Sequence, residues 1–277
     1  DVAVIGAGTG GYVAAIRAAQ LGKKVGVVER QKALGGTCLI WGCIPTKALL
    51  EHAHAMEIVQ GAKEWGITLP GGAPAIDMGQ VHARKDKIVT GLTKGIEFLF
   101  KKNKIDWIKG TARLLGNGKV DVFEGEKQSL QAKQIIVATG SSPRSVPGME
   151  IGRKRSITGD EAIHLKEVPK SMIILGSGAV GVEFASIYRR FGADVTVIEL
   201  LPRLVPVEDA TVSAELEKAF KKQGIKSLTG TKVTKATVTA KGVDIEAQGA
   251  DGKAQKLSCD LLLVATGRGP VTTGLGA

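Results

Sequence analysis

The chain has 277 residues, 43% of them hydrophobic, which suffices for one large or two ordinary domains, each with its own core. Three cysteines exclude a secreted disulfide scaffold and favour a reducing, intracellular compartment. Lys and Arg outnumber Asp and Glu by 38 to 27, but the basic clusters lack interleaved aromatic residues, so we expect no nucleic-acid binding. The apolar runs are too short to cross a membrane, and no charged-then-apolar leader precedes the first strand.

The first 30 residues predict a strand, a glycine-rich turn, a helix and a second strand. Gly6, Gly8 and Gly11 form a G-x-G-x-x-G pattern between the strand and the helix, and Glu29 follows 23 residues after Gly6. In this context the first glycine allows a tight turn, the second lets backbone approach a pyrophosphate, and the third lets helix pack on strand. The acid accepts a ribose hydroxyl, so the segment predicts a dinucleotide site.

Residues 35–47 hold two cysteines, Cys38 and Cys43, in the sequence GGTCLIWGCIPTK. A structural disulfide, a metal site, a redox couple and two buried thiols are the alternatives. In an α-helix, residues five apart are about 7.5 Å apart along the axis, too far for a disulfide, so we expect Cys38 in the turn before a helix. Pro45 suits the first helical turn, and Cys43 then lies at the helix N-terminus, which favours a thiolate.

A metal site is disfavoured because only Cys259 and scattered histidines remain as further ligands. We therefore expect no metal. The flanking nucleotide motif favours a redox-active pair over inert thiols. Cys259, alone before an apolar segment, is interpreted as a small buried residue.

The middle of the chain predicts two long helices, over 44–59 and 78–103, and then a small antiparallel meander over 105–125 with an Asn-Gly turn. An apolar strand ending in Ala-Thr-Gly follows at 134–140. The Ser, Pro and Gly content of 141–150 predicts a domain boundary there.

The first unit then recurs. Gly6, Gly8, Gly11 and Glu29 reappear 170 residues later as Gly176, Gly178, Gly181 and Glu199, again between an apolar strand and a helix. A strand-rich segment and a second strand ending in Ala-Thr-Gly close the chain. We therefore expect an α/β protein with two Rossmann-like dinucleotide-binding domains, over 1–143 (completed by 265–277) and over 144–264.

The cysteine segment closely resembles the active-site signature of the flavin disulfide oxidoreductases. Its Ile-Pro-Thr-Lys ending and the segment AVGVEFASIYRRFGADVTVIELLPRLVPVEDA are most similar to the dihydrolipoyl dehydrogenases, and the resemblance covers essentially the whole chain. It implies oxidation of protein-bound dihydrolipoyl groups, with electrons passing from the dithiol to a Cys38–Cys43 disulfide, then to FAD and NAD⁺. It also implies that Cys43 is the charge-transfer thiolate beside the flavin and that Cys38 is the interchange sulfur.

By this resemblance the 1–143 domain binds FAD and the 144–264 domain binds NAD. The implied FAD residues are Gly6, Gly8, Gly11, Glu29, Arg30, Gly35, Gly36, Thr37, Lys47, Gly110, Ala112, Thr139, Gly140 and Ser141. The implied NAD residues are Gly176, Gly178, Ala179, Val180, Gly181, Glu183, Glu199, Val233 and Gly267. Lys47 would approach the isoalloxazine ring, with Glu183 reaching toward it.

The implied partners are a dihydrolipoyl-bearing protein of the 2-oxo acid dehydrogenase or glycine cleavage complexes and, for the complete protein, a second copy of itself. The expected location is the cytoplasm, or the mitochondrial matrix in a eukaryote. Two departures from the family are visible. Ile40 stands where Asn is usual, and the second flavin segment and the interface domain with its His and Glu are not found. We expect a truncated chain without full activity.

Two rival interpretations remain. Glutathione or mercuric reductases share the cysteine signature, but they usually prefer NADP, for which Glu199 is unsuited. The chain could also be a module that holds FAD and NAD without catalysis.

Overall fold

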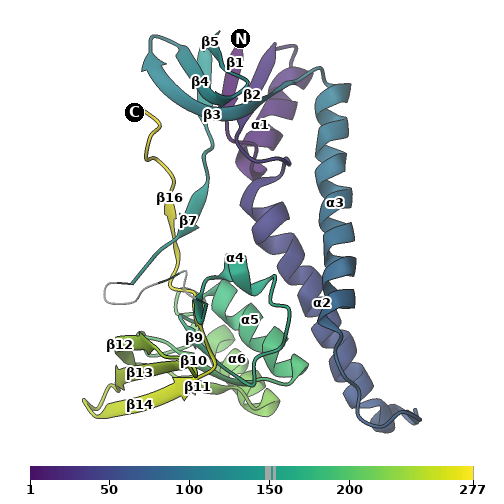
Figure 1. The fold of residues 1–277 in the computed structure, drawn as a ribbon, viewed down its shortest axis with the longest axis vertical. Coiled ribbons are helices and arrows are strands. Elements are labelled where there is room, and N and C mark those ends of the chain that lie inside the picture. Colours follow the sequence, from purple (N-terminus) through teal and green to yellow (C-terminus); the bar gives the residue numbers. More distant parts are fainter. Residues whose placement is uncertain (147–150, 152–153, 277) are drawn as a thin grey trace. The chain divides into compact units, whose positions relative to one another are not determined.

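The structure is a computed structural model that describes residues 1–146, 151 and 154–276 (Figure 1). The chain divides into two compact units: unit 1 comprises Asp1–Pro45, Asp86–Ser142 and Gly269–Ala277, and unit 2 comprises Thr46–Lys85 and Pro143–Arg268. The domain boundary predicted over 141–150 falls partly on residues 147–150, which lie outside the described residues. Both units are α/β, as predicted.

Unit 1 is built on one sheet of six strands, in the order β5-β4-β3-β2-β1-β6. Its elements in chain order are β1 (Val2–Ile5), α1 (Thr9–Gln20), β2 (Val25–Glu29), the π-helix η1 (Thr37–Trp41), β3 (Asp106–Gly116), β4 (Lys119–Gly125), β5 (Gln128–Gln131) and β6 (Gln134–Val137). Strands β6, β1, β2 and the start of β3 are parallel, and β3, β4 and β5 form the predicted antiparallel meander. The 11-residue strand β3 therefore belongs to both patterns.

The meander turn is the predicted Asn-Gly pair. Asn117 and Gly118 have φ values of 50° and 76°, so both central residues of the two-residue hairpin are left-handed. That combination is the one whose backbone twist matches the twist of the flanking strands.

Unit 2 contains a five-stranded parallel sheet, in the order β11-β10-β9-β15-β8, and a separate antiparallel sheet, β12-β13-β14. Its elements are the 3₁₀ helix η2 (Ala62–Trp65), β8 (Ser156–Ile157), α4 (Gly159–Ala162), β9 (Ser171–Leu175), α5 (Ala179–Phe191), β10 (Asp194–Ile198), α6 (Ala210–Gln223), β11 (Lys226–Leu228), β12 (Lys232–Val238), β13 (Val243–Gln248), β14 (Ala254–Cys259) and β15 (Leu261–Val264).

Four elements carry residues of both units: α2 (Cys43–Gln60), α3 (Met78–Lys102), β7 (Ser141–Pro143) and β16 (Arg268–Pro270). The strands β7 and β16 pair with each other where the chain passes between the units. Residues 46–85 group with unit 2, although the sequence-based domain limits place them with the first domain. Contacts inside unit 2 account for this: Arg190 forms an ion pair with Glu57 at 3.1 Å, and the buried Lys85 donates to the Ile163 carbonyl at 3.0 Å.

The same layering occurs in both units. In unit 1 one core cluster, which includes Val4, Ala15 and Phe100, joins the sheet to helices α1 and α3, and a second cluster joins it to the meander. In unit 2 the cluster containing Ile173 and Ile245 joins the parallel sheet to the β12–β14 sheet. The central parallel strands β1, β9 and β15 are buried on successive residues, and hence on both faces, as expected for parallel strands.

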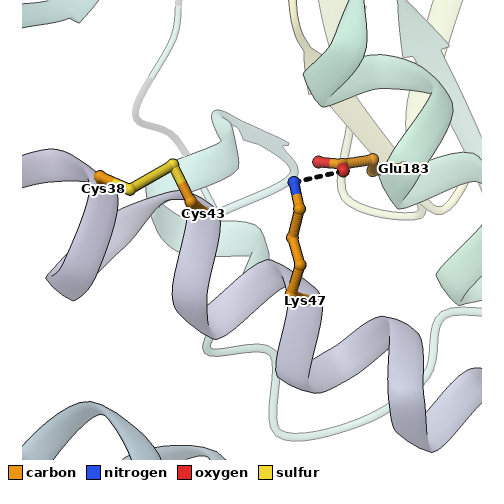
Figure 2. The surroundings of a disulfide bond; sticks show 4 residues. All are labelled: Cys38, Cys43, Lys47 and Glu183. Atoms are coloured by element: carbon orange, nitrogen blue, oxygen red, sulfur yellow. Dashed lines mark hydrogen bonds and ion pairs between the residues drawn. A yellow bond between two sulfur atoms is a disulfide. The ribbon is translucent and has the colours of Figure 1, made fainter. Parts of the chain in front are cut away.

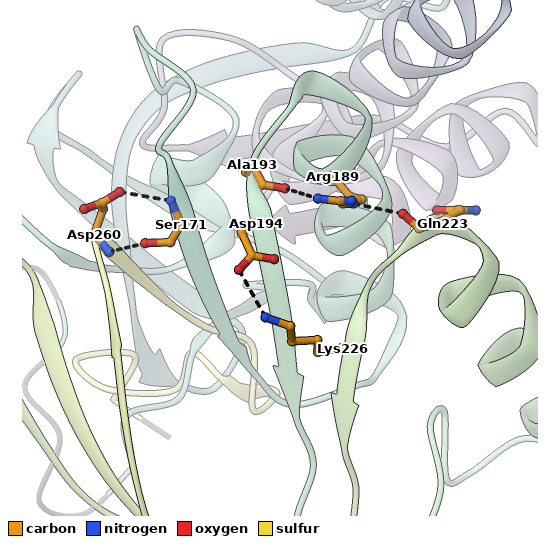
Figure 3. A network of polar contacts seen from close by, with 7 residues as sticks. All are labelled: Ser171, Arg189, Ala193, Asp194, Gln223, Lys226 and Asp260. Atoms are coloured by element: carbon orange, nitrogen blue, oxygen red, sulfur yellow. Dashed lines mark hydrogen bonds and ion pairs between the residues drawn. The ribbon is translucent and has the colours of Figure 1, made fainter. Parts of the chain in front are cut away.

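Polar side chains fix the amino ends of the unit 2 strands (Figure 3). Ser171 and Asp260 exchange two hydrogen bonds of 2.9 Å, which join the starts of β9 and β15. Lys226 and Asp194 form an ion pair of 3.2 Å between the starts of β11 and β10. Arg189 of α5 donates to two carbonyl oxygens, one just after α5 and one at the end of α6, at 3.2 and 2.8 Å. These contacts all lie toward the amino ends of the strands, whereas the glycine turn of unit 2 follows the carboxyl end of β9.

No helix among the described residues is long and apolar enough to cross a membrane.

Neighbouring glycines in α1 should respond oppositely to substitution by alanine. A Cβ on Gly11 would lie 1.9 Å from the Gly6 carbonyl oxygen, whereas a Cβ on Gly10 meets nothing within 4 Å. We expect Gly11→Ala to lower the free energy of unfolding by about 1–3 kcal/mol or more, since backbone must shift. Gly10→Ala should raise it by up to about 1 kcal/mol. Urea unfolding followed by circular dichroism checks both. Equal midpoints for the two variants would contradict this account of the turn.

Candidate functional site

Cys38 and Cys43 form a disulfide in unit 1, and their Cα atoms lie 4.6 Å apart. Cys43 is the first residue of α2 and Pro45 lies in its first turn, as predicted. The preceding segment differs in detail from the expected turn. Residues Thr37–Trp41 form a π-helix, whose i to i+5 hydrogen bonding brings residues five apart close together. An α-helix would have kept the two sulfurs apart, so the π-turn is what permits the bond.

Glycines join this redox turn to the first nucleotide turn. Gly36 has a φ of 59°, and a Cβ there would lie 2.4 Å from the Gly8 Cα. Gly35 forms a bridge with Gly8 and donates its N–H to the Ala7 carbonyl at 2.9 Å. Only Thr37 separates Gly36 from Cys38. The disulfide is thus built directly onto the glycine turn.

The first acid of the repeat, Glu29, ends β2 and is only 8% exposed. Its Oε2 accepts the Ala7 N–H at 2.7 Å, and its Oε1 accepts the Gln31 N–H at 2.8 Å. Glu29 therefore closes the glycine turn from the strand side, with one bond on each carboxylate oxygen.

The second acid, Glu199, follows β10 and is also 8% exposed. Its Oε2 accepts both the Ser177 N–H and the Ser177 hydroxyl, each at 2.8 Å, and its Oε1 accepts the Leu201 N–H at 2.9 Å. The two turns thus share their backbone bonds and differ by one hydroxyl, because Ser177 occupies the position of Ala7.

The glycine geometry at both turns fits a dinucleotide phosphate. The first and third glycines are closed to side chains: a Cβ on Gly176 would lie 2.6 Å from the Ala265 oxygen, and one on Gly181 would lie 2.0 Å from the Gly176 oxygen. The middle glycine is open, since a Cβ on Gly178 meets nothing within 4 Å. Gly8 and Gly178 cap α1 and α5 without a side-chain hydrogen bond, so amide hydrogens at both helix starts are available to an anion. The N-termini of α4 and α6, by contrast, are capped by side chains.

Lys47 of α2 and Glu183 of α5 meet within unit 2 (Figure 2), where the Lys47 Nζ lies 2.6 Å from the Glu183 Oε1. Lys47 is one helical turn beyond Cys43. The lysine side chain is 60% exposed, so the pair contributes little to stability, about 0–1 kcal/mol. The Lys47 ammonium group is directed at the Glu183 carboxylate.

The remaining predicted residues lie at the following places in the fold. Thr139 lies 3.3 Å from a Cβ built on Gly6, and Gly140 and Ser141 follow it. Ala179 and Val180 open α5, Arg30 follows β2, and Gly267 is the glycine of the second Ala-Thr-Gly, just after β15. Three residues lie elsewhere in the fold: Gly110 and Ala112 within β3, and Val233 in β12 of the separate antiparallel sheet.

Ser177 and the loop after Glu199 carry polar contacts that the sequence analysis missed. Arg203 donates from Nη2 to the carbonyl oxygens of Pro206 and Glu208 at 3.0 and 3.2 Å. Val205 has a φ of 41°, uncommon for a β-branched residue, and donates its N–H to the Ser177 carbonyl at 3.1 Å. The signal available in the sequence was the Ala7 to Ser177 difference between otherwise matching motifs.

Cys259 behaves as interpreted. It is buried at the end of β14, and burial raises the pKa of its thiol to about 11. Among the described residues there is no group of three or more His, Cys, Asp or Glu side chains suited to hold a metal ion.

The comparisons with known proteins agree with this geometry. The family model for pyridine nucleotide-disulphide oxidoreductases matches residues 1–277. Dihydrolipoyl dehydrogenase 3 of Pseudomonas putida is 48% identical over 99% of the chain, and dihydrolipoyl dehydrogenase of Bacillus subtilis is 44% identical over all of it. The chain spans 59% and 60% of the lengths of these two relatives.

A solved structure of similar fold is the HOCl-induced flavoprotein disulfide reductase RclA from Escherichia coli, in its Cu(II) complex. It aligns with a TM-score of 0.83 at 26% identity, over the whole of this chain and 58% of its own. With a redox turn joined to the first of two matching dinucleotide turns, and with a family model covering its full length, the chain belongs to the pyridine nucleotide-disulphide oxidoreductase family.

Proposed function

We propose that the protein carrying this chain is a flavoprotein that oxidises protein-bound dihydrolipoyl groups and passes the electrons to NAD⁺. The observation that carries the proposal is the Cys38–Cys43 disulfide mounted on the first glycine turn through Gly36 and Gly8. A dinucleotide bound at this turn would have the disulfide beside it, which supports a redox role for the two cysteines. The family uses FAD and NAD(H). The similarity to dihydrolipoyl dehydrogenases supports the dithiol substrate.

The cysteines would perform the dithiol exchange. A substrate thiolate attacks the Cys38 sulfur, the Cys38–Cys43 bond breaks, and Cys43 leaves as a thiolate. The second substrate thiol loses its proton to solvent and attacks the substrate sulfur of the mixed disulfide, so that the substrate becomes a cyclic disulfide and Cys38 leaves as a thiolate. FAD held at the first glycine turn would supply the acceptor for the two electrons of the reduced cysteines, with NAD⁺ as the final acceptor.

The assignment of the two sulfurs rests on helix electrostatics. Cys43 begins α2, where the positive end of the helix stabilises a thiolate leaving group. Lys47 lies one turn later, but its charge is paired with Glu183. Exposure alone would favour the reverse assignment, since Cys43 is exposed and Cys38 is half-buried. The single variants described below separate them.

We assign FAD to the first glycine turn, in the 1–143 domain with 265–277, and NAD to the second, in the 144–264 domain. The disulfide adjoins the first turn, which supports placing the flavin there. The partners would be a dihydrolipoyl-bearing protein of a 2-oxo acid dehydrogenase or glycine cleavage complex and a second copy of the protein. The location would be the bacterial cytoplasm or the mitochondrial matrix.

Dihydrolipoamide oxidation tests the function directly. Cys38→Ser and Cys43→Ser should each lower NAD⁺ reduction by dihydrolipoamide at least about 10³-fold, because neither leaves a disulfide to accept electrons. Cys38→Ser should keep a long-wavelength absorption band from the Cys43 thiolate beside the flavin, and Cys43→Ser should lack it. Cys259→Ser is the matched control and should keep both turnover and spectrum. Activity retained in either active-site variant would overturn the proposal. If the absorption band were present in Cys43→Ser and absent in Cys38→Ser, Cys38 would be the charge-transfer thiolate and Cys43 the interchange sulfur.

Thiol counting tests the disulfide. The oxidised, denatured protein should present one reactive thiol and the reduced, denatured protein three, because Cys38 and Cys43 are released together. In the native oxidised protein at pH 8 labelling should be slow, since burial raises the pKa of Cys259 to about 11 and the thiol stays protonated below that pH. Rapid labelling of all three cysteines without reductant would refute the disulfide.

The second turn should prefer NAD to NADP. The Glu199 carboxylate would repel a 2′-phosphate, and Arg203, the nearest following arginine, is committed to carbonyl oxygens of its own loop. We expect NADP to bind at least about tenfold more weakly in equilibrium titrations. Glu199→Gln should narrow this ratio without abolishing NAD binding, and Glu29→Gln, at the other turn, should leave it unchanged. Equal affinities of the unaltered protein for the two nucleotides would show that Glu199 does not select.

A further inference from the structure

The two glycine turns differ in how many hydrogen bonds their acids can still accept. A carboxylate has about four lone-pair sites, two on each oxygen. The protein itself fills one site on each oxygen of Glu29, through the Ala7 and Gln31 amides. It fills three sites on Glu199, because the Ser177 amide and hydroxyl both bond to Oε2 while the Leu201 amide bonds to Oε1.

The two carboxylates therefore differ in the number of acceptor sites left for a ligand. Glu29 keeps about one site on each oxygen, which suits two neighbouring hydroxyls of one ribose. Glu199 keeps about one site, on Oε1, and its Oε2 is saturated. Both carboxylates are 8% exposed, so solvent access does not distinguish them.

We propose that Ser177 is a positioning residue that restricts Glu199 to a single ribose hydroxyl of the nucleotide bound at the second turn. The hydroxyl acts through the carboxylate and not on the ligand. The proposal rests on the NAD site assigned above, and it concerns which hydroxyls of the adenosine ribose contribute to affinity.

The chain itself shows that alanine is compatible with this position. Ala7 occupies the equivalent place in the first turn, with the same backbone bond to its acid. Ser177→Ala should therefore keep the turn and free one acceptor site on Oε2. Ser213→Ala is the matched control: Ser213 is also fully buried in unit 2, but its hydroxyl donates to the Val205 carbonyl, at 3.4 Å.

Titration of the flavin-loaded protein with NAD and with its 2′-deoxy and 3′-deoxy adenosine analogues tests the proposal. In the unaltered protein one analogue should bind about 10- to 100-fold more weakly than NAD, as expected for a lost hydrogen bond to a charged group, and the other within about threefold. In Ser177→Ala both analogues should bind about 10- to 100-fold more weakly than NAD. Ser213→Ala should match the unaltered protein.

The outcomes separate this inference from the proposed function. If NAD binds and both analogues are already weakened in the unaltered protein, or if Ser177→Ala leaves the ratios unchanged, Ser177 does not restrict Glu199. A purely structural role would weaken NAD and both analogues by one common factor, which also overturns the proposal. Failure of NAD itself to bind would overturn both the inference and the assigned NAD site.

Discussion

The constraint on which both units depend is the direct contact between a helix and the strand before it. At Gly11 and at Gly181 a side chain would lie about 2 Å from the carbonyl oxygen of the first glycine, so the helix start rests on the turn itself. Neither α1 nor α5 has a side-chain cap at this start, so their first amide hydrogens are available to an anion. It also sets the distance across which Glu29 and Glu199 reach the turn amides.

Only a few residues connect the Cys38–Cys43 disulfide to the first glycine turn. Gly36 rests on Gly8, and one π-turn later the chain enters α2 with Cys43 at its first position. The contact of Gly36 with Gly8 sets how closely the cysteine segment approaches the first glycine turn. The π-helix sets the spacing of the Cys38 and Cys43 sulfurs, and α2 then places Lys47 one turn after Cys43. A π-helix is rare and strained relative to an α-helix, and its presence at a functional site follows a general pattern.

Local patterns were sufficient to predict the repeated strand-turn-helix units and the Asn117–Gly118 hairpin, because residues close in the sequence determine them. The π-helix was not predicted. The spacing of Cys38 and Cys43 excluded a regular α-helix through both cysteines, but it did not determine which kind of turn replaces that helix. The grouping of residues 46–85 with unit 2 depends on contacts between distant segments, such as Glu57 with Arg190. The bond from Ser177 to Glu199 was missed because serine is an ordinary small residue until its hydroxyl is placed.

The single hydroxyl of Ser177 also bears on how long each nucleotide stays bound. Differences in affinity between related sites arise mostly in the dissociation rate. If the proposed role of Ser177 holds, Glu29 could accept two ribose hydroxyls and Glu199 one, so a nucleotide at the first turn would leave about 10- to 100-fold more slowly for this one further charged hydrogen bond. A flavin that stays through many cycles and a nicotinamide nucleotide that leaves in every cycle need such different residence times. On this proposal, a serine in place of an alanine would give two otherwise matching turns this difference in residence time.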